Sequence, residues 1–167
     1  DGFRAWLKRR YGTLERLNAA WQTRFWSVVY TDWSEIDIRH CEAGYPSIDL
    51  DVRRYHSDSW VEFASHQAGI LRRHHPGALV TTNMMGPVFR WIDYHELAKV
   101  VDVACDDLYF DMTTMSGDAL AADVFRSLKP GKRFWVTETG SASLVTGKPP
   151  HADQLRAWAF SSAARGS

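Results

Sequence analysis

Residues 78–138 contain three similar apolar stretches, ALVTTN (78–83), VVDVACDD (100–107) and RFWVTE (133–138). Two helical patterns separate them, one from Asp93 to about Lys99 and one over ALAADVFRSL (119–128). Strands that alternate with helices and read as continuous apolar runs are typical of a parallel sheet covered by helices. We therefore predict an α/β fold. Its strands are expected at 78–82, 100–105 and 133–137.

A polar residue stands at the end of each stretch: Asn83 in the first, Asp107 in the second and Glu138 in the third. Parallel strands place their carboxyl ends on the same side of a sheet, and in barrels and doubly wound sheets this side carries the active site. We expect these three side chains to converge there. No glycine-rich phosphate loop follows any of the strands, which argues against a nucleotide-binding fold.

The chain upstream of these strands has a different pattern. A first helix is expected to stop at Gly12, and Thr13 can cap a short second helix, LERLNAAW. Residues 21–58 lack clear periodicity. Ser59-Trp60-Val61-Glu62 has the form of a capping box that opens a helix ending before Pro76-Gly77.

We therefore predict a helical and irregular part over 1–58 and βα units over 59–167. Both ends of the chain lie inside helical patterns, so we expect a segment of a larger domain. A closed (β/α)8 barrel has eight strands, and three βα units cannot close one.

The composition excludes several classes of protein. Of the 167 residues, 45% are hydrophobic and 24% are charged, which is typical of a globular chain with a core. Lys plus Arg and Asp plus Glu both total 20, whereas proteins that bind nucleic acid through phosphates normally show a basic excess. No apolar run is long enough for a membrane helix. We predict no nucleic-acid partner and no membrane partner.

Glu138 is the strongest candidate for a catalytic residue. It closes an apolar strand and is followed by Thr and Gly. A carboxylate that leaves hydrophobic surroundings at a catalytic face is costly unless it is paired, so it often has a function. A capping or salt-bridging glutamate at a loop entrance is the alternative, and spacing alone does not choose between the two.

The other candidates also have two interpretations. The Asn83 amide could bind a ligand hydroxyl or only close a turn. Asp107 and Tyr109 offer an acceptor and a phenol. The alternative to a binding role for the pair Asp106-Asp107 is that one carboxylate is solvated and the other is structural.

Metal binding is not indicated. His74-His75 are expected to satisfy the last carbonyls of a helix. His40-Cys41 has no second ligand pair at metal spacing, and Cys41 and Cys105 alone cannot make a zinc site. The 8 Trp and 6 Tyr residues suit a dense core or a sugar-binding surface, and packing is the more common use.

Several of these segments together resemble one family. The run FRAWLKRRYGTLERLNAAWQTRFWSVVYTDWSEI (3–36) is similar to a segment of glycoside hydrolase family 42, the β-galactosidases. Further pieces follow in the family's order: TTNMMG (81–86), Asp93-Tyr94, Asp102 with Asp107-Leu108-Tyr109, FWVTE (134–138) and LRAWAFSSAARG (155–166).

The resemblance implies a retaining glycosidase on a (β/α)8 TIM barrel, of which this chain would be an internal fragment with about strands five to seven. Glu138 matches the family's nucleophile. Tyr109 matches a tyrosine that lies beside this nucleophile in the family and would keep its carboxylate oriented. Asn83 and Asp107 would line the substrate pocket. The implied substrate is a β-galactoside, with no cofactor and no metal. The resemblance favours the cytoplasm and leaves open whether the parent is a homo-oligomer.

There are also departures from the family. Its Asn-Glu acid/base pair, expected upstream of Asp1, does not occur in the chain, so we expect the fragment alone to be inactive. A Trp common after the nucleophile is replaced by SASLVTGKPP (141–150), which leaves the sugar specificity open. The alternatives are a retaining barrel glycosidase for another sugar, a non-catalytic carbohydrate-binding module and a barrel piece without function.

Overall fold

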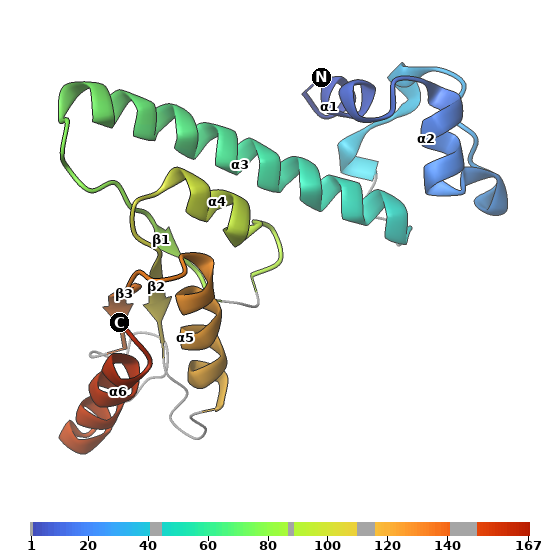
Figure 1. The fold of residues 1–167 in the computed structure, drawn as a ribbon. Helices are drawn as coiled ribbons and strands as arrows, with labels where there is room; N and C mark the ends of the chain where they lie inside the picture. The colour runs from blue at the N-terminus through green and yellow to red at the C-terminus, as the bar shows by residue number, and fades with distance from the viewer. Residues whose placement is uncertain (1, 41–44, 87–88, 110–115, 141–149) are drawn as a thin grey trace. The chain divides into compact units, whose positions relative to one another are not determined.

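The computed structural model describes residues 2–40, 45–86, 89–109, 116–140 and 150–167. The chain divides into two compact units, Asp1–Trp60 and Val61–Ser167, and each is described by itself. Figure 1 shows the elements. They are α1 (Gly2–Tyr11), α2 (Leu14–Trp21), η1 (Thr23–Trp26), η2 (Trp33–Glu35), η3 (Ile38–His40), α3 (Pro46–His74), β1 (Asn83–Met84), α4 (Tyr94–Val100), β2 (Cys105–Leu108), α5 (Ser116–Leu128), β3 (Trp135–Thr139) and α6 (Ala152–Ala164).

The first unit has an aromatic core built on two short helices. Gly12, with a φ of +75°, follows the end of α1, and the Thr13 side chain accepts a hydrogen bond from the Arg16 backbone at the start of α2. Both expectations for this turn are confirmed. The buried side chains of the core are Phe3, Trp6, Leu7, Leu17, Trp21, Ile36, Ile48 and Val52.

The helix expected to open at Ser59 begins much earlier. α3 runs without a break over 29 residues from Pro46, so the predicted capping box is wrong. The Ser59 hydroxyl instead donates to the Tyr55 carbonyl one turn back, at 2.7 Å, which a serine inside a helix commonly does. Proline suits the first turn of a helix because its missing N–H is not needed there.

The second unit contains a parallel sheet of three strands in the order β1-β2-β3, as the sequence predicts. The strand bounds differ from the prediction. Val100 is the last residue of α4, and β2 begins only at Cys105. Asp102, in the connection before β2, exchanges hydrogen bonds with Val80: its N–H donates to the Val80 carbonyl at 2.7 Å, and its side chain accepts from the Val80 N–H at 2.8 Å.

Helices cover one side of this sheet. Figure 1 shows α5 running beside β2. The largest buried cluster consists of Met84, Tyr94, Leu97, Ala98, Val101, Ala104, Ala122, Phe125, Leu128 and Phe134. Leu108, Ala121 and Trp158 form a smaller cluster. Val136 packs against both clusters, so its side chain lies on the helix-covered side.

β3 contains an irregularity at its centre. Asp106 pairs with Val136, but Asp107 pairs with Glu138, so Thr137 is one extra residue in β3. Side chains alternate along a strand, which would place Glu138 on the same side as Val136. Because a bulge shifts that alternation by one residue, Glu138 lies on the same side as Asp107, away from the helix-packed cluster.

Candidate functional site

Glu138 lies near the carboxyl end of β3, and both of its carboxylate oxygens accept hydrogen bonds. The Asn83 amide, from β1, donates to Oε1 at 2.9 Å. The Tyr109 hydroxyl, just after β2, donates to Oε2 at 2.6 Å. Three segments far apart in the sequence thus hold one carboxylate in a defined orientation. The predicted convergence is confirmed for Asn83 and Glu138, and Tyr109 joins them.

Asp107 belongs to the same group. Its Oδ1 accepts a hydrogen bond from the Thr137 hydroxyl at 3.1 Å. Burial raises the pKa of Asp107, and the negative charge of Glu138 adds to the increase, whereas hydrogen bonds from Thr137 and Asn83 oppose it. All four residues singled out from the sequence therefore lie together.

Tyr109 is suited to act as a donor. Its hydrogen bond to Glu138 is the main cause that raises the pKa of the phenol above its usual value of 10.0. The hydroxyl therefore keeps its proton at neutral pH. The side chain is 49% exposed, so the group around Glu138 is accessible in the described part of the chain.

The neighbouring carboxylates of Asp106 and Asp107 lie in different environments. Asp106 is only 1% exposed and accepts a hydrogen bond from the Gly86 N–H at 3.0 Å. Burial is the main cause that raises its pKa from 3.8 to about 6. Asp106 is thus the structural carboxylate of the pair, and Asp107 is the one beside Glu138.

One residue near the group, Thr137, was missed by sequence reasoning. Thr137 creates the bulge, and no pattern in RFWVTE signals an extra residue in the strand. Asp106 anchors the turn after β1 together with Tyr94, whose hydroxyl accepts from the Met85 N–H at 2.8 Å. The sequence had offered one structural carboxylate in the pair Asp106-Asp107, but not its hydrogen bond to Gly86 in this turn.

The described residues offer little support for other kinds of site. Among them, no group of at least three His, Cys, Asp or Glu side chains could hold a metal ion. Cys105 is a buried free thiol that contacts the Thr81 hydroxyl at 2.7 Å, and Cys41 lies outside the described residues. In the same part of the chain, no helix is long and apolar enough to cross a membrane.

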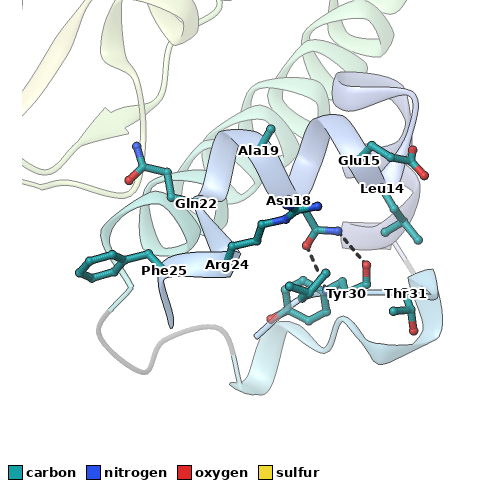
Figure 2. A pocket seen from close by; sticks show the side chains of 10 residues that line it. Leu14, Glu15, Asn18, Ala19, Gln22, Arg24, Phe25, Tyr30 and Thr31 are labelled. Carbon is teal, nitrogen blue, oxygen red and sulfur yellow. Dashed lines mark hydrogen bonds between the residues drawn. The ribbon is translucent and has the colours of Figure 1, made fainter. Parts of the chain in front are cut away.

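A separate pocket of about 710 Å³ lies in the first unit (Figure 2). The Asn18 amide organises one wall by bonding to both backbone groups of Tyr30, at 2.7 and 3.0 Å. Phe25, another lining residue, is 78% exposed. The other lining residues are Leu14, Glu15, Ala19, Gln22, Arg24, Val29 and Thr31. The pocket shares no lining residue with the group around Glu138.

Most of the described aromatic residues upstream of α3 are used for packing. Trp21 is buried, and its ring meets that of Tyr30 edge-on at 5.8 Å between centroids. Tyr30, Trp33 and Tyr45 also pack against the core of the first unit. Phe25, by contrast, is largely exposed.

Comparison with known proteins adds to this geometry. The family model for glycoside hydrolase family 42, described as beta-galactosidase, matches residues 1–167. The chain belongs to glycoside hydrolase family 42. Beta-galactosidase BgaP of Planococcus sp. (strain L4) is 33% identical to this family-42 chain over 180 residues, covering 100% of the chain and 26% of the relative. Beta-galactosidase BglY of Alicyclobacillus acidocaldarius is 41% identical over 111 residues, covering 65% of the chain and 16% of the relative.

Solved structures agree with this family assignment. The beta-galactosidase from Bacillus circulans sp. alkalophilus matches the family-42 chain with a TM-score of 0.87 and 37% identity, covering 99% of the chain and 26% of that structure. The enzyme from Rahnella sp. R3 matches with a TM-score of 0.88 and 33% identity, over 99% and 26%. The chain thus spans about a quarter of the length of these relatives. It is an α/β piece with a parallel sheet, in a family whose members have a TIM barrel.

Proposed function

We propose that Glu138 is the nucleophile of a retaining glycoside hydrolase that cleaves terminal β-galactosides. The observation that carries this proposal is the pair of hydrogen bonds from Asn83 and Tyr109 to the two oxygens of the Glu138 carboxylate. Two fixed donors orient the group without neutralising it, and a nucleophile that must attack one carbon atom needs such an orientation.

The proposed reaction has two steps. In the first, a Glu138 oxygen attacks C1 of the galactoside while a second carboxyl group protonates the leaving oxygen, and the C1–O bond to the leaving group breaks. In the second, water attacks C1, gives its proton to the second carboxyl group and releases Glu138 as a carboxylate. On this proposal Asn83 and Tyr109 hold Glu138 in both steps, and Asp107, which pairs with Glu138 in the sheet, accepts a hydrogen bond from a sugar hydroxyl.

The second carboxyl group is proposed to come from a part of the enzyme outside residues 1–167. A retaining enzyme needs two carboxyl groups about 5–5.5 Å apart. The family's Asn-Glu pair does not occur in the sequence. On this proposal β1, β2 and β3 are the fifth, sixth and seventh strands of the barrel, with residues 1–58 following the fourth. The 167 residues alone are then expected to show no turnover.

A covalent label tests the proposal directly. The full-length enzyme is treated with an activated 2-deoxy-2-fluoro-β-galactoside, which forms the glycosyl-enzyme but hydrolyses slowly. The peptide that contains Glu138 should gain the mass of one fluorogalactosyl group. Labelling of a different residue, or none in an active enzyme, would refute the role of Glu138.

Substitution provides the second test. Glu138→Gln in the full-length enzyme should lower kcat for an aryl β-galactoside by about 10⁴-fold or more, while galactose still binds. Added azide should restore turnover of Glu138→Gly and give α-galactosyl azide, because the small anion replaces the missing carboxylate.

Two alternatives make different predictions in these experiments. A retaining enzyme for another sugar would give the same label with a different fluorosugar and a different preference in a panel of aryl glycosides. A non-catalytic carbohydrate-binding module would bind sugar unchanged after Glu138→Gln and would hydrolyse nothing. The family match over the whole chain favours an enzyme.

A further inference from the structure

Thr137 occupies an unusual place in β3. It lies between Val136, which pairs with Asp106, and Glu138, which pairs with Asp107, so no residue of β2 is paired with it. Its side-chain hydroxyl lies 3.1 Å from Oδ1 of Asp107 and 3.4 Å from the Asp106 carbonyl. The side chain of Thr137 therefore connects this extra residue to β2, in place of a backbone pairing between the strands.

The bulge decides which way Glu138 points. Without an extra residue, alternation would place Glu138 with Val136, against the helix-packed side of the sheet. With the extra residue, Glu138 lies opposite Asp107 and within reach of Asn83 and Tyr109. A hydroxyl bonded to the carboxylate of Asp107 holds the two strands together at the pair that contains Glu138.

We propose that Thr137 is a positioning residue for the glycosidase reaction: its hydroxyl holds the bulge that directs Glu138 toward the substrate side of the sheet. This inference rests on the proposed function of Glu138. On this proposal Thr137 acts through Glu138 and Asp107 and not on the sugar itself. The same hydrogen bond opposes the increase in the pKa of Asp107 that burial and the Glu138 charge cause.

A purely structural role is the competing explanation, because threonine is common in strands for its β-branched shape. Thr137→Val separates the two roles. Valine keeps the branch and the volume but cannot bond to Asp107. Thr137→Ser loses the methyl group but keeps the hydroxyl. A structural role predicts that Val is tolerated better than Ser, and a positioning role predicts the opposite order.

The experiment uses the full-length enzyme and three measurements: kcat and KM with an aryl β-galactoside, the rate of covalent labelling by the fluorogalactoside, and the melting temperature. Thr137→Val should lower kcat and the labelling rate by about 10- to 100-fold with little change in KM. The reason is that the Glu138 carboxylate is displaced by up to about 1 Å. Thr137→Ser should stay within about threefold of the wild type. Thr137→Ala also lacks the hydroxyl and replaces Thr137→Val if that variant does not fold.

Thr139→Val is the matched control. Thr139 lies on the same strand, pairs with Leu108 and lines an apolar hollow with Leu155 and Trp158. Its substitution should leave kcat unchanged.

Each outcome bears on one of the two proposals. Wild-type kcat in Thr137→Val, or equal losses in Thr137→Ser and Thr137→Val, would overturn the inference about Thr137 and leave the role of Glu138 intact. A wild-type enzyme that neither cleaves nor is labelled by β-galactosides would refute the proposed function, and the inference about Thr137 would fail with it.

Discussion

Tyr109, the residue that follows β2, and Glu138 in β3 share a 2.6 Å hydrogen bond from the phenol to Oε2 of the carboxylate. The two residues are 29 positions apart in the sequence. The bond exists because β2 and β3 are parallel and end at the same edge. On the proposed function this bond orients the nucleophile, and it can be removed without changing the shape of either side chain.

Tyr109→Phe removes only the hydroxyl. We expect kcat of the full-length enzyme to fall by about 10- to 100-fold, less than for Glu138→Gln, because one charge-assisted hydrogen bond is lost while the nucleophile stays. Steady-state kinetics with an aryl β-galactoside measure the effect. An unchanged kcat would mean that this hydrogen bond has no part in the reaction.

Asn83→Ala removes the other donor to Glu138. We expect a loss of kcat of about tenfold or more, since one hydrogen bond to a charged group contributes about 1.5–3 kcal/mol. In the double variant with Tyr109→Phe, the fold-loss of kcat should differ from the product of the two single losses. The reason is that both donors hold one carboxylate. Multiplicative effects in this cycle would show that the two donors act independently.

Asp106→Asn should stabilise the protein at neutral pH. The folded-state pKa of Asp106 is raised from 3.8 to about 6, so the folded state holds a proton that the unfolded state releases. The wild type therefore loses stability as pH rises from about 4 to about 6, by roughly 3 kcal/mol at 1.36 kcal/mol for each pKa unit. Asparagine does not titrate, and its side-chain oxygen can still accept from the Gly86 N–H.

Melting temperatures of wild type and Asp106→Asn across the pH range test this prediction. The stability of the variant relative to wild type should increase between pH 4 and pH 6 and then stay constant. A relative stability that does not change with pH would contradict a buried carboxyl group with a raised pKa.

Asp51 connects three elements of the first unit. Its side chain is 1% exposed and accepts from the Trp21 indole at 2.9 Å, from the Tyr11 hydroxyl and from Arg54 at 3.0 Å. Asp51→Ala leaves these donors without their acceptor, so we expect a loss of about 3 kcal/mol or more in the free energy of unfolding. Chemical denaturation of the full-length enzyme measures the loss.

Asp49→Ala is the control for Asp51. Asp49 lies on the same helix and pairs with Arg53 at 2.7 Å, with both side chains about one-third exposed. Its loss should cost no more than about 1 kcal/mol. Equal effects of the two substitutions would contradict the special role of the buried carboxylate.

Local signals in the sequence predicted several elements correctly. Gly12 and Thr13 mark the turn between α1 and α2, and Asp93 caps α4 by accepting from the His95 and Glu96 N–H groups. These features depend on neighbours within a few residues, so a single sequence contains the information. The start of α3 was missed because its first turns are rich in polar residues, and its buried face becomes apparent only against the aromatic core of the first unit.

The sequence by itself determined the order of strands and helices, the parallel sheet and the meeting of Asn83, Asp107 and Glu138, because alternating elements force the strand ends to one edge. Only the tertiary structure decided where the strands begin and which way Glu138 points. Hydrogen bonds between strands define the pairing, and a bulge at Thr137 reverses the side that alternation alone would give. Such pairing depends on distant residues, so it cannot be read from the stretch that contains Glu138.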